Sequence, residues 1–182
     1  MLLENSLYAT CDSNFIEKFA KTRHKHRKET IFRLKNNLAY LHEEEKKTFI
    51  FFYGKIDRNK QRSCISIEIE KFEVTGEEKP VELLKSLGFV KVAVNYTESY
   101  IIDMNKYVVE CFRFKKSEEI VDSSEEEAKL NEQLEEESNK ENEFTVKVFC
   151  YTDDVLEGEK ILSGAYEDLG IKLIVPDIKN VI

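Results

Sequence analysis

Two glutamates in one predicted strand are the residues best placed to do chemistry. The run from Ser66 to Glu70 alternates carboxylate and apolar side chains. In a strand, residues two apart project from the same face, so Glu68 and Glu70 would share one face and Ile67 and Ile69 the other. Paired carboxylates suit a hard divalent cation such as Mg²⁺. The alternative is an ordinary sheet with an outward polar face.

Other residue types that commonly do chemistry are scattered along the chain. His24, His26 and His42 lie in polar surroundings without a nucleophile partner, and a helix would point His24 and His26 toward different faces. Neither a Gly-rich phosphate loop nor a Gly-x-Ser-x-Gly elbow occurs. Apart from Glu68 and Glu70, we therefore predict no catalytic residue, no cofactor and no metal ligand. The cysteines lack metal-ligand spacing and are expected to be reduced core residues: Cys11, Cys64, Cys111 and Cys150.

The charge of the chain is concentrated in one segment. The whole sequence of 182 residues, within the size of a single domain, has a net charge of −8, and residues 117–143 alone hold twelve acidic residues and two lysines. The rest is nearly neutral, so we expect no direct nucleic-acid binding. The basic run Lys21 to Lys28 lacks interleaved aromatic residues and is interpreted as a solvated helix end, with a phosphate or nucleic-acid patch as the alternative.

The acidic segment is predicted to be a disordered loop inserted in a single domain spanning 1–182. It has no aromatic residue and too few apolar ones to offset the entropy of ordering. Ser123 and Ser124 precede three glutamates, a context that an acid-directed kinase would accept.

No apolar run reaches about 18 residues and no secretory signal pattern opens the chain, so we expect a soluble intracellular protein without a membrane segment.

Periodicity predicts an α+β domain rich in antiparallel strands. Helices are expected after Asp12 or Ser13, at 80–88 with a left-handed Gly88, and after Asp153 or Asp154. Strands are expected at 5–10, 30–34, 38–41, 48–53, 63–72, 89–96, 100–104, 107–114, 144–151 and 171–175. Residues Phe49 to Tyr53 are apolar on both faces, which suits a strand covered by a partner protein. The candidate interface residues are Phe49, Phe51, Tyr53, Tyr96 and Tyr100.

The Glu-x-Glu strand resembles those of the triphosphate tunnel family, whose barrels bind a divalent ion with carboxylates and a polyphosphate with Arg and Lys. The resemblance implies a barrel in which Glu68 and Glu70 hold the metal of a triphosphatase. That family usually opens with a second acidic strand, whereas here the run Leu7 to Cys11 stands in that place. Basic pairs that share strand faces lie near strand ends: Arg33 with Lys35, and Arg113 with Lys115.

The order of elements also resembles subunit 18 of the Mediator complex, a non-catalytic relative of the triphosphate tunnel barrels. The resemblance rests on the opening strand with Phe15, Ile16 and Phe19 behind it, and on four further blocks. These blocks are Leu83–Phe89, Tyr107–Phe112, Phe144–Val148 and Gly170–Asp177. It implies a curved antiparallel barrel of about eight strands with three helices. It also implies a nuclear scaffold that binds Mediator subunits 20 and 8 and, through the head module, RNA polymerase II.

Overall fold

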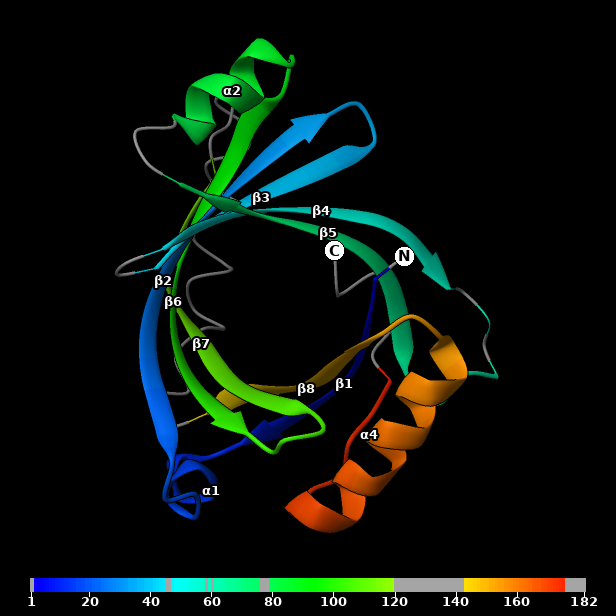
Figure 1. Ribbon diagram of the computed structural model, residues 1–182. Coiled ribbons are helices and arrows are strands. Elements are labelled where there is room, and N and C mark those ends of the chain that lie inside the picture. The colour runs from blue at the N-terminus through cyan, green and yellow to red at the C-terminus, as the bar shows by residue number, and fades with distance from the viewer. Residues whose placement is uncertain are drawn as a thin grey trace, which may run out of the picture.

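The computed structural model describes residues 2–44, 47–57, 59, 61–75, 79–119 and 143–175. Eight antiparallel strands form a closed barrel in the order β1-β5-β4-β3-β2-β6-β7-β8 (Figure 1). They are β1 (Leu3–Cys11), β2 (Thr22–Leu34), β3 (Asn37–Glu43), β4 (Thr48–Asp57), β5 (Ile65–Val74), β6 (Val90–Asp103), β7 (Val108–Glu119) and β8 (Phe144–Thr152). The described helices are α1 (Ser13–Glu17), α2 (Pro80–Ser86) and α4 (Val155–Leu169). The predicted barrel with three helices is confirmed.

The strand β2 is where the sequence prediction of the fold was wrong. The helix after Asp12 ends at Glu17, and β2 begins at Thr22, so the basic run lies in a strand and not at a helix end. Asp12 does cap α1, because its side chain accepts from the Phe15 N–H. Charged residues occupy both faces of β2, which hides the usual alternation of apolar and polar residues.

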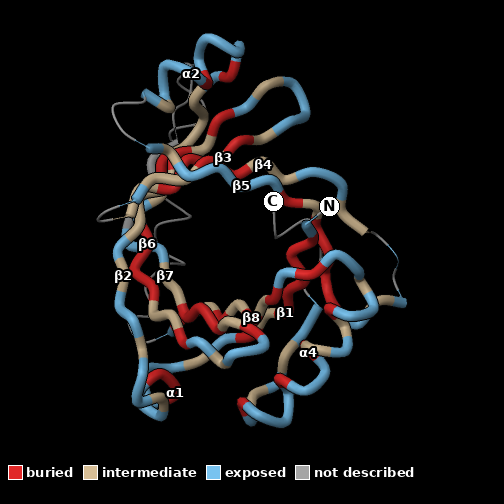
Figure 2. The backbone as a smooth tube through the Cα atoms, in the orientation of Figure 1, coloured by how far each residue is buried: buried red, intermediate tan, exposed pale blue. Residues whose placement is uncertain are grey.

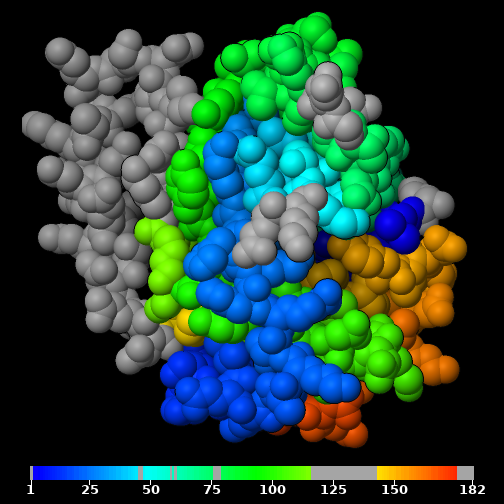
Figure 3. Space-filling model, turned by 60° about the vertical axis from the view of Figure 1, so that its left-hand side comes forward, coloured from blue at the N-terminus to red at the C-terminus, as the bar shows by residue number. Residues whose placement is uncertain are grey.

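Helix α2 covers a small core on the outside of the barrel. Its buried Leu84 packs with buried apolar residues that project outward from the strands beneath: Phe32, Ala39, Leu41, Ile50 and Phe89. Gly88 ends the helix with a φ of 89°, a left-handed conformation that glycine adopts without steric cost. Figure 3 shows α2 at one end of the molecule and α1 at the other.

Helices α1 and α4 cover a larger core on the outer faces of β1, β7 and β8. It includes Phe15 and Ile16 from α1, Leu162 and Ala165 from α4, and the fully buried Val146 of β8. Figure 2 shows this buried layer between α4 and the strands. The two cores lie on the barrel wall, so the interior is left to a different set of side chains.

Three predicted strands in the second half of the chain differ from the structure. The runs at 89–96 and 100–104 are one long strand, β6, because its charged Glu98 is satisfied by neighbouring cations and does not break the pairing. The predicted strand 171–175 is reduced to a single bridge between Tyr8 and Ile174, whose two backbone hydrogen bonds have nitrogen-to-oxygen distances of 2.9 and 2.7 Å. Most of the predicted acidic loop, residues 120–142, lies outside the described residues. Among the residues that are described, no helix is both long and apolar enough to span a membrane.

Candidate functional site

The inward faces of the strands enclose a polar cavity of about 180 Å³. Alternation along each strand sends every second side chain inward, and several of those are charged. The lining residues are Glu4, Tyr8, Arg27, Glu29, Tyr40, His42, Tyr53, Ile67, Glu110, Phe112, Phe114 and Lys147. The barrel interior is therefore neither an apolar core nor a purely basic tunnel, because carboxylates and cations meet inside it.

The first and last strands contribute one ion pair to the cavity. Lys147 Nζ on β8 lies 2.6 Å from Glu4 Oε1 on β1, and the two side chains are 16% and 4% exposed. Burial disfavours the Lys147 ammonium, but the adjacent Glu4 carboxylate outweighs it and holds the pKa of Lys147 well above its usual value. Lys147 is therefore charged and committed to Glu4.

A second pair crosses the cavity between β2 and β7. Arg27 Nη1 lies 3.2 Å from Glu110 Oε1, at ion-pair distance. The two groups are not aligned for a hydrogen bond, and both Arg27 Nε and Glu110 Oε1 are buried without one among the described residues. Buried polar atoms of this kind are usually satisfied by water, and the cavity volume is large enough to hold it.

His42 and Glu29 form the third polar contact in the cavity. His42 Nε2 lies 2.7 Å from Glu29 Oε2. Burial, together with the nearby Arg27 charge, lowers the pKa of His42 despite the opposing effect of Glu29, so the ring is neutral at pH 7. Burial would raise the pKa of Glu29, but the adjacent His42 and Arg27 lower it, so this carboxylate is ionised.

The charge of the cavity follows from these protonation states. Three carboxylates, Glu4, Glu29 and Glu110, face the two cations Arg27 and Lys147 among the lining residues. The tyrosines add no charge, because burial raises the pKa of Tyr40 to about 12 and that of Tyr53 above its usual value. The cavity lining therefore has no excess of positive charge.

The two glutamates predicted as metal ligands lie on the other side of the wall. Ile67 lines the cavity, so Glu68 and Glu70, one residue out of phase with it, project outward. The Glu68 carboxylate accepts from the Lys55 backbone N–H at 3.4 Å, and Glu70 is exposed. The alternation was interpreted correctly, but the apolar face of this strand is the inner one, so the two carboxylates are not cavity ligands.

The predicted interface residues are divided between the two faces of the barrel. Tyr53 lines the cavity, and Phe49 and Phe51 have the same inward phase, with Phe51 only 7% exposed. Outside the barrel, Tyr96 is 37% exposed, and Tyr100 stacks on His24 with ring centroids 4.7 Å apart. The three β4 residues thus face the barrel interior, with Phe49 and Tyr53 only partly buried, and a partner role for all five residues stays a prediction.

The functional residues that the sequence did not reveal are those of the cavity. Glu4 was missed because β1 begins at Leu3, upstream of the run Leu7 to Cys11 that was compared with the acidic opening strand of tunnel enzymes. Glu4, Ser6 and Tyr8 share the inward face, so an acidic residue is present on that strand after all. The sequence held no local signal for these residues, because each charge stands alone on its strand and only the pairing of the strands brings the charges together.

Comparisons with known proteins identify the fold alone. Neither protein-family models nor curated protein sequences match this chain. Among solved structures, the Schizosaccharomyces pombe Mediator head module matches with a TM-score of 0.69 and 11% identity, over 94% of this chain and 97% of the matched chain. The Pyrococcus horikoshii protein PH1012 matches with a TM-score of 0.64 and 19% identity, over 93% and 91% of the two chains.

A third similar structure is that of an enzyme. The putative adenylyl cyclase HpAC1 from Hippeastrum, described with a dominant triphosphatase activity, matches with a TM-score of 0.56 and 9% identity, over 100% of this chain and 93% of that one. The same barrel therefore occurs in a Mediator assembly and in a triphosphatase. Function has to be argued from the residues of this chain.

Proposed function

We propose that this chain is a non-enzymatic structural subunit of the Mediator head module, acting in the nucleus in transcription by RNA polymerase II. The observation that carries the proposal is the internal pairing of the cavity charges. Lys147 is bound to Glu4, Arg27 faces Glu110, and His42 beside Glu29 is neutral. A polyphosphate needs several cations free to neutralise it, and the cavity lining has fewer cations than carboxylates.

A scaffold instead needs surfaces on which partners can bury apolar area. Helix α2 and its C-terminal end present such a surface, because Leu83 and Leu87 are 53% and 56% exposed and lie four residues apart on one helix face. Val90, at the start of β6, is 59% exposed. Leucines exposed in this way are typical of sites that bind another protein. We assign this α2 surface, together with Tyr96, to contacts with Mediator subunits 20 and 8.

The test is co-purification of the full chain with Mediator subunits 20 and 8, followed by size-exclusion chromatography with light scattering. We expect a stable complex that does not hydrolyse triphosphate. The double variant L83E/L87E would place two charges in an apolar contact and should weaken the complex by tenfold or more. A tenfold change in the dissociation constant corresponds to about 1.4 kcal/mol of binding free energy. Leu156→Glu is the matched control, because Leu156 is an exposed leucine, 61% accessible, on the distant α4.

The proposal fails if the correctly folded chain forms no complex with either subunit. A complex that forms equally well with L83E/L87E and with Leu156→Glu would keep the scaffold function but move its interface away from α2. The circular dichroism spectrum of each variant separates these outcomes from misfolding.

A triphosphatase is the second candidate, favoured by the carboxylates inside the barrel. Glu4, Glu29 and Glu110 line the cavity, in place of Glu68 and Glu70, but their oxygens do not all lie within 4.8 Å of one another, so a divalent ion would have to draw them together. An oxygen-only ligand set of this kind suits Mg²⁺ or Mn²⁺. This function predicts metal-dependent hydrolysis of tripolyphosphate that is lost in Glu110→Gln and kept in Glu68→Gln. Absence of hydrolysis by the folded wild-type chain would exclude it.

A further inference from the structure

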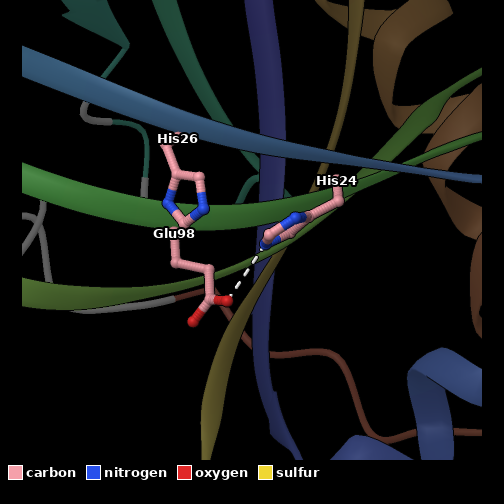
Figure 4. A group of neighbouring side chains, drawn as sticks. All are labelled: His24, His26 and Glu98. Atoms are coloured by element: carbon pink, nitrogen blue, oxygen red, sulfur yellow. Dashed lines mark hydrogen bonds and ion pairs between the residues drawn. The ribbon is translucent and has the colours of Figure 1, made fainter.

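A second cluster of ionisable side chains lies on the outer face of the barrel, away from the cavity. Because β2 is a strand, His24 and His26 are two residues apart and project from the same face. Glu98 on β6 is paired directly opposite His26 in the strand register. Figure 4 shows both rings beside the Glu98 side chain. The pairing of β2 with β6 thus brings together three groups that a helix would have separated.

The ligand atoms of these three residues are close enough to share one ion. One nitrogen from each ring and one oxygen of the carboxylate all lie within 4.8 Å of one another. His24 Nε2 lies 3.0 Å from Glu98 Oε1, at hydrogen-bond distance. Two ligands of a tetrahedral zinc ion, each about 2.1 Å from it, lie about 3.4 Å apart. A zinc ion would replace this hydrogen bond and lengthen the separation by about 0.4 Å, which is a small side-chain movement.

We propose that His24, His26 and Glu98 form a zinc-binding site that joins β2 to β6 on the outer surface of the barrel. Two imidazoles and one carboxylate are ligands that zinc accepts, with one tetrahedral position left for water or a partner side chain. Mg²⁺ and Ca²⁺ prefer six or more oxygen ligands, which this cluster does not offer. The site is independent of the proposed scaffold function and of the cavity.

The surroundings hold two of the three ligands in place. The Tyr100 ring stacks on His24, with centroids 4.7 Å apart, and its hydroxyl donates to Glu98 Oε1 at 3.4 Å. Glu98 is itself buried, at 7% exposure, so its carboxylate has little freedom to turn away. His26 is exposed, as is His24, and the two rings meet edge to face with centroids 4.7 Å apart.

Two cations near the Glu98 carboxylate oppose metal binding, so removing one of them should strengthen it. Arg113 Nε and Lys115 Nζ each lie 2.8 Å from Glu98 Oε2, the oxygen that does not face His24. They contact Oε2, whereas Oε1 lies beside His24 Nε2 and the Tyr100 hydroxyl, and their charges repel a cation bound to this carboxylate. Lys115 is 46% exposed, so it can be changed without opening the core. Removing its charge should strengthen zinc binding, which no purely structural role for the cluster predicts.

The test is titration of ZnCl₂ into the untagged full chain by calorimetry, with excess MgCl₂ present to occupy carboxylate-only sites. We expect one zinc ion per chain. His26→Ala should weaken binding about 30-fold or more, because lost ligands and supporting groups typically cost 10- to 100-fold or beyond. Lys115→Gln should tighten binding about three- to tenfold. Co²⁺ substitution should give the visible absorption of a tetrahedral site, lost in His26→Ala.

Matched controls distinguish this site from other binders of zinc. Glu70→Gln removes an exposed carboxylate on the outer face, and Cys11→Ser removes the partly exposed thiol; both should leave the affinity unchanged. His26 is exposed, so His26→Ala should fold normally even if a change at Glu98 does not. The proposal is overturned if the wild-type chain does not bind one zinc ion per chain. It is also overturned if His26→Ala binds zinc as tightly as the wild type.

Discussion

At the scale of single residues, the pair of Glu4 and Lys147 ties the stability of the barrel to charges inside it. Changing Lys147 to Met leaves the Glu4 carboxylate buried without its partner, which should cost about 3–5 kcal/mol. The double variant E4Q/K147M removes both charges and should recover most of that loss. Urea unfolding followed by circular dichroism measures both free energies of unfolding.

An exposed ion pair provides the control for this comparison. Lys79 Nζ and Glu82 Oε1 are 3.2 Å apart, with side chains 71% and 69% exposed. Lys79→Met should change the free energy of unfolding by less than about 1 kcal/mol, as solvated pairs do. If Lys147→Met were equally harmless, the cavity would have to be far better hydrated than its volume indicates.

Glu98 provides a pH dependence at the same scale. Burial would raise its pKa, but Lys115, Arg113 and His24 outweigh that effect and lower it from 4.5 to about 2. A carboxyl group with a lowered folded-state pKa contributes stability above its unfolded pKa, and that contribution is lost as pH falls. We expect the wild type to lose stability between pH 4.5 and pH 2 more steeply than Glu98→Gln. The free energy of unfolding of each protein is measured by denaturant unfolding at pH 4.5 and at pH 3. An equal loss of this free energy in the wild type and in Glu98→Gln would contradict the prediction.

At the scale of elements, two glycines in α4 have opposite roles. A Cβ at Gly158 would lie 2.2 Å from Asn5 Cγ, so this glycine permits the close approach of α4 to β1. A Cβ at Gly164 meets nothing within 4 Å. Gly158→Ala should destabilise the protein by about 2 kcal/mol or more, while Gly164→Ala should stabilise it by up to about 1 kcal/mol. Thermal unfolding of the two variants should shift in opposite directions.

Whether a helix or strand could be predicted from the sequence depends on whether it has one apolar face. Elements with one apolar face were predicted well, including the helix that begins at Pro80, the cap at Asp154 and the strand Phe144 to Thr152. Only the second half of β2 was recognised, as the predicted strand at 30–34, because its first half lies between a charged cavity and a solvated surface and has no apolar face to detect. For β5, alternation separated Glu68 from Ile67 but carries no information on which face is inside.

The cavity and the outer cluster of two histidines and a glutamate could not be predicted for a related reason. Their members come from strands far apart in the sequence: Glu4 meets Lys147, and His24 meets Glu98. Each charge taken alone is indistinguishable from a solvated surface residue. Only the closed order of strands, which depends on long-range pairing, places them together.

At the scale of the whole molecule, closure of the barrel depends on β1, which is paired with β5 on one side and β8 on the other. Asn5 on this strand is fully buried. Its Nδ2 donates to Thr152 Oγ1 at 2.8 Å, and its Oδ1 accepts from Ser66 Oγ at 2.6 Å. One side chain therefore links β1 to both of its neighbours, β5 and β8.

Asn5→Ala should accordingly weaken the entire barrel and not one strand alone. The change leaves Ser66 with a buried hydroxyl that has lost its partner and opens a small void beneath α4, at a cost of about 2–4 kcal/mol. Because closure couples all eight strands, circular dichroism and tyrosine fluorescence should report one transition with the same midpoint. Asn14→Ala is the control, since Asn14 is exposed and its side chain donates to Asp12 Oδ2, two residues away. Two separate transitions in Asn5→Ala would show instead that the β2–β5 meander unfolds independently of the strands around β1.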